Sequence, residues 1–124
     1  MNRKKIIILE DDQLIINLYK LLLKNEDYEI KIAQTPAEAL KYLNQDKYSL
    51  IIADISLAHE GMEGIEFIKL IKNNEKFSSI PAIAVTGYNL KHDIDKILEA
   101  GYCECITKPI KTQEFKDLIK KYII

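Results

Sequence analysis

The chain has 124 residues, 48% of them hydrophobic, which suits one domain with a single core and leaves no length for a second module. Its 18 Lys and Arg residues nearly balance 19 Asp and Glu residues, so the net charge of -1 provides no field that would favour direct nucleic-acid binding or an anionic membrane. The apolar run at residues 6–9 is too short for a signal peptide or membrane span, and two cysteines without further metal-ligand partners indicate a reduced, cytoplasmic protein.

Short apolar runs alternate along the chain with longer segments whose apolar residues recur every three or four positions. The short runs predict strands at residues 5–9, 28–33, 50–54, 82–86 and 102–106. The longer segments predict helices at residues 13–24, 36–44, 64–73, 90–100 and 112–122. Because several strands are apolar throughout, both faces of the sheet should be covered by helices, which is typical of a parallel sheet in a doubly wound α/β domain.

Residues at the predicted helix and strand boundaries agree with this pattern. Thr35 and Glu38 form a capping-box sequence, with Pro36 at the first helical position. Gly101 follows a predicted helix where a left-handed residue is expected, and Pro81 stands at the start of a strand, where its missing N–H does least harm. We therefore expect one five-stranded domain over residues 1–124, without an output domain, that acts through a partner protein.

Polar residues follow four of the predicted strands, and the carboxyl ends of parallel strands meet at one edge of the sheet, where ligands of such folds bind. Carboxylates gathered at a partly buried edge repel one another, so they need a cation or raised pKa values. Mg²⁺ meets that need because it takes oxygen ligands and requires only one or two carboxylates. The residues concerned are Glu10, Asp11 and Asp12 after the first strand, Asp54 at the third, Thr86 at the fourth and Lys108 after the fifth.

Each of these residues also has an ordinary structural interpretation. The three acids can cap a helix and interact with its dipole, with Asp12 as the cap in either case, and Asp54 can initiate a turn. Thr86 can be a plain strand residue, and Lys108 can be solvated. Asp54, however, ends an apolar run that is too deep for an idle charge. The recurrence of such residues at successive strand ends favours a shared site.

Four segments together resemble response-regulator receiver domains, and the resemblance extends over essentially the whole chain. Such domains have a flavodoxin-like sheet with strand order 2-1-3-4-5, and the length of this chain is similar to that of stand-alone regulators. The segments are IIILEDD at residues 6–12, IIADI at 51–55, AVTG at 84–87 and ITKP at 106–109.

The resemblance implies a role for each matching position. Asp54 would accept a phosphoryl group from a histidine kinase or histidine phosphotransfer protein. Thr86 would hydrogen-bond a phosphoryl oxygen and Lys108 would pair with it, and the change would be read through the face formed by the fourth helix, fifth strand and fifth helix. The ligands of Mg²⁺, or of Mn²⁺ in its place, would be Glu10 through water, Asp11, Asp54 and the backbone carbonyl of Ser56.

The sequence departs from the family pattern in strand five and in the loop after Asp54. Family members usually carry Tyr or Phe three residues before the strand-five lysine, where this chain has Cys105. We expect Tyr102 or Tyr88 to take over the readout, and we interpret Cys103 and Cys105 as strand residues rather than a redox pair. The loop at residues 55–64 is also longer than in commoner members.

The first predicted helix has an apolar arc wider than one core-facing stripe. A helical wheel places Ile15, Leu18 and Leu22 toward the core, with Ile16 and Leu23 on one side of that stripe and Leu14 and Leu21 on the other side. That side either lies under neighbouring structure or is a docking surface. The resemblance favours docking of the phosphodonor there.

Two other functions compete with this hypothesis. Cys105 allows a receiver-like interaction module that works without phosphorylation, but the complete set of strand-end residues argues against it. A flavin-binding protein or a phosphatase could share the sheet topology. Flavin binding would require a glycine-rich phosphate loop after strand one, and an aspartate-based phosphatase would carry a second acid at the position of Ser56.

Overall fold

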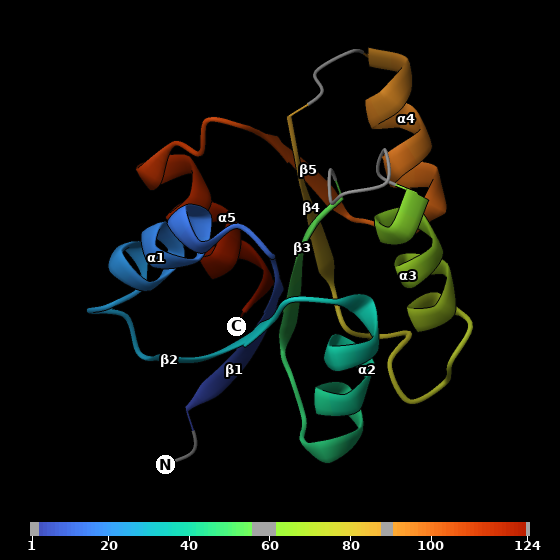
Figure 1. The fold of residues 1–124 in the computed structure, drawn as a ribbon, viewed down its shortest axis with the longest axis horizontal. Coiled ribbons are helices and arrows are strands. Elements are labelled where there is room, and N and C mark those ends of the chain that lie inside the picture. The colour runs from blue at the N-terminus through green and yellow to red at the C-terminus, as the bar shows by residue number, and fades with distance from the viewer. Residues whose placement is uncertain (1–2, 56–61, 88–90, 124) are drawn as a thin grey trace.

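A computed structural model describes residues 3–55, 62–87 and 91–123, and it places five strands and five helices in strict alternation (Figure 1). In chain order the elements are β1 (Lys4–Leu9), α1 (Gln13–Leu22), β2 (Tyr28–Ala33), α2 (Pro36–Gln45), β3 (Leu50–Asp54), α3 (Met62–Lys72), β4 (Ala82–Thr86), α4 (Lys91–Ala100), β5 (Glu104–Thr107) and α5 (Thr112–Tyr122). In the described ranges, no helix is long and apolar enough to cross a membrane.

The strands form one parallel sheet in the order β2-β1-β3-β4-β5, as the resemblance implies. Helices α1 and α5 cover one face, and α2, α3 and α4 cover the other (Figure 1). Each strand is connected to the next by a helix, since parallel strands need a crossover connection. All five strands therefore end at the same edge of the sheet.

Two hydrophobic layers, one on each face of the sheet, hold the helices in place. Along β1, Ile7 and Leu9 belong to the layer under α2, α3 and α4, whereas Ile6 and Ile8 belong to the layer under α1 and α5. All residues of β3 and β4 are buried, as expected for central strands covered on both faces. The continuous apolar runs of the sequence are a consequence of this double burial.

The predicted starts of α1 and α2 are confirmed by their capping contacts. Thr35 Oγ1 accepts a hydrogen bond from the Glu38 N–H at 3.1 Å, and the Glu38 carboxylate accepts one from the Gln34 N–H at 2.9 Å. Asp12 caps α1 by accepting a hydrogen bond from the Leu14 N–H at 2.9 Å. Gly101 follows α4 with a φ of +135°, a backbone conformation that residues other than glycine rarely adopt, as predicted for the end of a helix.

The prediction for the fifth strand is wrong at its start. The sequence predicts a strand from residue 102, but β5 begins at Glu104. Tyr102 lies in the turn before β5, and its side chain is buried in the core. Cys103 also precedes the strand, and it is exposed. The end of α1 at Leu22 and the start of α3 at Met62 also differ from the prediction by two residues, and the remaining boundaries agree within one residue.

The core-facing side of α1 also differs from the prediction. The buried residues are Ile16, Tyr19 and Leu23, and the predicted stripe of Ile15, Leu18 and Leu22 is only partly buried. The core-facing side of α1 is centred on Tyr19, which is fully buried, and not on Leu18. Leu14 and Leu21 lie away from this side and are exposed.

Gly64 in α3 is the glycine whose replacement should cost most stability through crowding. A Cβ at this position would lie 2.6 Å from Ile55 Cγ2 and 2.7 Å from Ile55 Cα, so Gly64→Ala must displace buried structure despite its better helix propensity. We expect a loss of about 2 kcal/mol in the free energy of unfolding, measured by urea denaturation.

Gly87→Ala is the matched control, because no atom lies within 4 Å of a Cβ at position 87. Its stability should change by less than about 0.5 kcal/mol. Equal effects of the two substitutions would show that α3 does not lie against Ile55 as described.

Candidate functional site

Two buried carboxylates and a lysine meet at the carboxyl edge of the sheet. The parallel register pairs Leu9 of β1 with Ala53 of β3, so Glu10 and Asp54 follow as neighbours at adjacent strand ends. Asp54 is 3% exposed and Glu10 is fully buried. The Lys108 ammonium donates a hydrogen bond to Asp54 Oδ2 at 2.7 Å and lies 4.0 Å from Glu10 Oε1. The structure thus brings together Glu10, Asp54 and Lys108, as predicted.

The two oxygens of Glu10 have different surroundings. Oε2 accepts a hydrogen bond from the Asp12 N–H at 3.1 Å, whereas Oε1 accepts none from the described residues. Burial and then the negative charge of Asp54 raise the pKa of Glu10 from 4.5 to about 7. A buried oxygen with an unused acceptor position beside a second carboxylate is suited to a cation ligand.

Lys108 is held in its charged form by the acids around it. Burial acts to lower the pKa of Lys108, but the hydrogen bond to Asp54 and the charges of Asp54, Glu10 and Asp12 outweigh burial and raise it. The lysine follows β5 directly, and its own N–H donates to the Thr86 carbonyl at 2.8 Å. The peptide bond between Lys108 and Pro109 is cis. The neighbouring acids thus keep Lys108 positively charged beside Asp54 and Glu10.

The remaining predicted site residues lie at the same edge or outside the described ranges. Thr86 is fully buried at the end of β4 and pairs in register with Thr107. Asp11 is exposed between β1 and α1, next to Glu10. Ser56, predicted to offer its carbonyl to the metal, lies outside the described residues. Tyr88, one of the two predicted readout residues, does so too.

Tyr19 is a residue near this site that the sequence analysis did not identify. Its side chain is fully buried, and its hydroxyl has no hydrogen-bond partner among the described residues. Burial raises the pKa of Tyr19, and the charges of Glu10 and Asp54 raise it further, so the phenol lies within electrostatic range of both acids. In the sequence it is only one more helical residue with an aromatic ring, which packs 5.4 Å from the ring of Phe115.

The described residues contain no cluster of three His, Cys, Asp or Glu side chains placed to hold a metal ion. A closed zinc-type site, which needs four protein ligands, is therefore not formed by this part of the chain. Mg²⁺ makes smaller demands, because it keeps several waters and uses one or two carboxylates. The pair of Glu10 and Asp54, with the unused oxygen of Glu10, fits that requirement.

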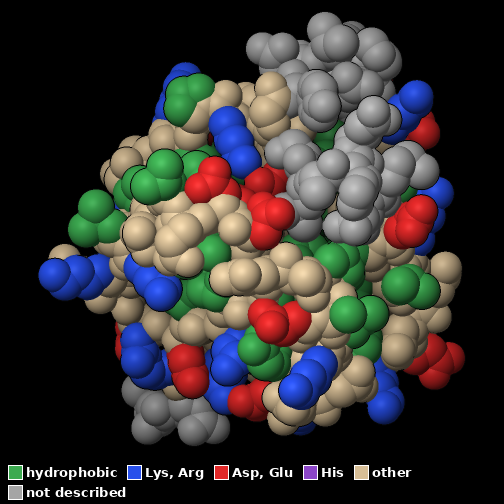
Figure 2. All heavy atoms as spheres, viewed as in Figure 1, with side chains coloured by type: hydrophobic (Ala, Val, Ile, Leu, Met, Phe, Trp, Pro, Cys, Tyr) green, Lys and Arg blue, Asp and Glu red, His purple; other side chains and the backbone are tan. Residues whose placement is uncertain are grey.

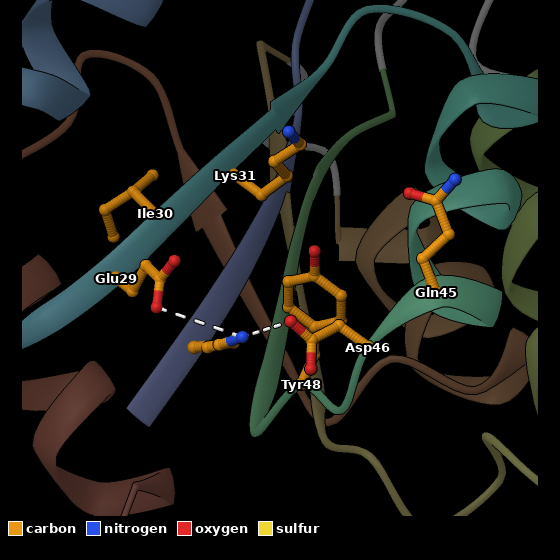
Figure 3. Close-up of a pocket in the computed structure, with 7 residues that line it drawn as sticks. Glu29, Ile30, Lys31, Gln45, Asp46 and Tyr48 are labelled. Carbon is orange, nitrogen blue, oxygen red and sulfur yellow. Dashed lines mark hydrogen bonds and ion pairs between the residues drawn. The ribbon is translucent and has the colours of Figure 1, made fainter. Parts of the chain in front are cut away.

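A hollow of about 310 Å³ lies at the amino end of the sheet, opposite the acid pair (Figure 3). Lys5 forms ion pairs with Glu29 and Asp46 there. Lys31 also lines the hollow, so two lysines balance the two acids there. On the face shown in Figure 2, acidic and basic side chains are likewise interspersed. The hollow therefore offers no counterpart to the buried, uncompensated charge at the carboxyl edge.

The raised pKa of Glu10 predicts that stability depends on pH when divalent cations are absent. Folded protein keeps this proton up to about pH 7, whereas the unfolded chain loses it near 4.5, so the folded state binds more protons between these values. The free energy of unfolding should therefore fall as the pH rises through this window, by on the order of 2 kcal/mol. Urea denaturation from pH 5 to 8 with a chelator measures this change.

Glu10→Gln removes the titrating group and should flatten the profile. Asp46 and Glu104 titrate below this window, because hydrogen bonds from Lys5 and Tyr122 lower their pKa values. A wild-type stability that rises from pH 5 to 7 would contradict the description of the acid pair.

Comparisons with known proteins agree with this geometry. The family model of the response regulator receiver domain matches residues 6–120. The polar-differentiation response regulator DivK of Brucella ovis, like that of Brucella suis, is 33% identical over 120 residues, which span 97% of this chain and 96% of DivK.

Solved structures show the same fold. The crystal structure of a CheY-like response regulator receiver domain protein from Methanospirillum hungatei JF-1 has a TM-score of 0.85 and 30% identity, covering 98% of this chain and 94% of the other. The receiver domain of the sensor histidine kinase PA1611 from Pseudomonas aeruginosa PAO1, whose structure has a magnesium ion in the active site cleft, has a TM-score of 0.86 and 22% identity and covers 98% of each chain. With its family match and relatives extending over nearly its whole length, the chain belongs to the response regulator receiver family, whose members accept phosphoryl groups in two-component signalling.

Proposed function

We propose that Asp54 is the phosphoacceptor, and that it takes its phosphoryl group from the phosphohistidine of a kinase or phosphotransfer protein. The observation that carries this proposal is the burial of Asp54 at 3% exposure, hydrogen-bonded to Lys108 and beside the buried Glu10. A carboxylate kept so close to a second one and to a lysine is positioned for chemistry with an anionic group. The chain is a signalling switch rather than an enzyme with turnover on a separate substrate.

In the proposed transfer, a carboxylate oxygen of Asp54 forms a bond to phosphorus as the bond between phosphorus and the donor imidazole nitrogen breaks. The imidazole leaves with the electrons of that bond, and no general base is needed because a carboxylate is already a nucleophile. The transition state carries negative charge on the equatorial phosphoryl oxygens, so the protein's work is positioning and neutralisation. The ammonium of Lys108 can follow these oxygens from its place on Asp54, and Thr86 supplies a hydroxyl at the same edge.

We assign the metal position to Glu10, Asp11, Asp54 and the Ser56 carbonyl. Mg²⁺, or Mn²⁺, would there neutralise the carboxylates and the incoming phosphoryl oxygens. The unused oxygen of Glu10 supports this assignment, since it offers an acceptor with no hydrogen-bond partner among the described residues. Glu10 would act through a coordinated water and Asp11 as a direct ligand.

Replacing the acceptor should remove phosphorylation without unfolding the protein. With acetyl phosphate and Mg²⁺, intact mass spectrometry should show one added phosphoryl group on the wild type and none on Asp54→Asn, because the amide is a poor nucleophile. A chelator should also stop labelling of the wild type. Thermal melting of the variant controls for folding.

Two results would exclude the assignment. One is an Asp54→Asn protein that is labelled at the wild-type rate, and the other is labelling that persists in full when divalent cations are chelated. The first would move the acceptor elsewhere, and the second would remove the metal from the reaction.

We further propose that the histidine donor docks on the exposed apolar side of α1. Leu14 is 78% exposed and Leu21 is 68% exposed, and they lie about two helical turns apart on this helix. Helix α1 begins directly after Glu10, Asp11 and Asp12, so a partner seated there would reach the acceptor. Phosphorylation would change partner binding through the face formed by α4, β5 and α5. We also propose that residues 1–124 form a single receiver domain and that the protein is cytoplasmic.

A charge on the docking side should separate the two routes of phosphorylation. Leu14→Glu should slow transfer from a phosphohistidine protein by about tenfold, because it introduces a charge into an apolar contact, and should leave labelling by acetyl phosphate unchanged. Leu70→Glu is a matched control, because Leu70 is 58% exposed on α3, on the other face of the sheet. Equal slowing by both variants would contradict docking on α1.

The alternatives are less well supported. A receiver-like module that works without phosphorylation is not favoured, because the acid pair and Lys108 are in place and the chain belongs to a phosphoryl-accepting family. The flavin and phosphatase hypotheses gain no support from the family match.

A further inference from the structure

Tyr102 connects the turn between α4 and β5 to the first part of α3. Its ring is in the core with 3% exposure, and its hydroxyl donates a buried hydrogen bond of 2.8 Å to the Gly64 carbonyl. The two residues are 38 positions apart in the chain. Gly64 lies inside α3, so its carbonyl also serves the backbone of the helix. Helix α3 therefore does not need the hydrogen bond from Tyr102 to satisfy the Gly64 carbonyl.

Gly64 in turn lies against the residue that follows the proposed acceptor. A Cβ on Gly64 would be 2.6 Å from Ile55 Cγ2 and 2.7 Å from Ile55 Cα, so backbone and side chain of Ile55 are in close contact with this turn of α3. Ile55 is 4% exposed, and its N–H donates to the Val85 carbonyl at 2.9 Å. A shift of the first turn of α3 must therefore displace Ile55, and with it the adjacent Asp54.

The other end of the Tyr102 connection is equally fixed. Gly101 lies against α3, since a Cβ there would be 2.8 Å from Lys72 Cγ, and the Cys103 N–H donates to the Ala82 carbonyl at 2.8 Å. The phenol therefore extends from the amino end of β5 toward the acid pair. Burial and then the charge of Asp54 raise the pKa of Tyr102, which agrees with that direction.

We propose that the Tyr102 hydroxyl is a positioning group that holds the first turn of α3 against Ile55 and so couples the turn between α4 and β5 to Asp54. The coupling to phosphorylation rests on the proposed function of Asp54. Because coupling between two positions is reciprocal, a displacement at Asp54 changes the hydrogen bond of Tyr102, and loss of that bond changes Asp54. The connection does not use Cys105, which is half-buried on β5.

An ordinary core tyrosine predicts a different outcome. If the hydroxyl merely satisfies its own hydrogen-bonding need, its removal affects stability alone. A positioning group must also change the backbone at Ile55 and the rate at Asp54. Tyr102→Phe separates the two cases because it keeps the buried ring and removes only the hydroxyl.

The experiment compares wild type, Tyr102→Phe and Tyr48→Phe well below their unfolding temperatures. Tyr48 is the control, because its partly buried ring packs against the same core layer and its hydroxyl forms no hydrogen bond with the described residues. Amide hydrogen exchange is measured without phosphodonor at Ile55 and at residues 66–68. The rate of labelling by acetyl phosphate with Mg²⁺ is then measured across donor concentrations.

In Tyr102→Phe we expect exchange at these amides to be faster by on the order of fivefold, the effect of one neutral hydrogen bond. The maximal labelling rate should fall by a similar factor, with the half-saturating donor concentration unchanged, since geometry at Asp54 and not donor binding is altered. Tyr48→Phe should behave as wild type.

Unchanged exchange in Tyr102→Phe overturns the proposal, and so does faster exchange with a wild-type labelling rate. In both of these cases the wild type is labelled, so the proposed function stands while the inference fails. A wild type that is not labelled at all instead overturns the proposed function, and with it the coupling to Asp54.

Discussion

The structure depends on the burial of two neighbouring carboxylates, Glu10 and Asp54, at the end of an apolar sheet. Taking such groups out of water costs several kcal/mol each unless they are paired, so the pair is tolerated only with a compensating cation. Lys108 supplies one positive charge, 2.7 Å from Asp54 and 4.0 Å from Glu10. With two ionised acids and one lysine, the edge would carry a net negative charge, which supports the proposed cation site. The parallel sheet matters functionally because it is what brings these strand ends together.

Much of this fold follows from short-range sequence patterns. The fully buried strands β3 and β4 are predicted with their exact ends because an apolar run between charged or turn residues leaves little choice. The predicted capping contacts of Thr35 and Asp12 are present for the same reason, since a cap involves only residues two or three positions apart. The site residues Glu10, Asp54, Thr86 and Lys108 are predictable because topology converts strand ends, which are local features, into a single edge.

The features that sequence reasoning misses are those fixed by contacts between distant segments. Tyr102 reads as a strand residue, yet its burial comes from packing along α3 and its hydroxyl bonds to Gly64. The need for glycine at position 64 comes from Ile55, which belongs to another element. On α1, the core-facing side includes the fully buried Tyr19, whereas the helical wheel placed that side by the positions of isoleucine and leucine alone. In all three cases the determining contact joins segments that are far apart in the sequence.

Binding of Mg²⁺ beside Glu10 and Asp54 should exchange a proton for the cation. Calorimetric titration with Mg²⁺ at pH 7, in two buffers with different ionisation enthalpies, measures this exchange directly. Because the pKa of Glu10 is raised to about 7, binding should release roughly half a proton per Mg²⁺, and Glu10→Gln should release none at this position. Binding of Mg²⁺ to the wild type without proton release, or no binding at all, would contradict the account.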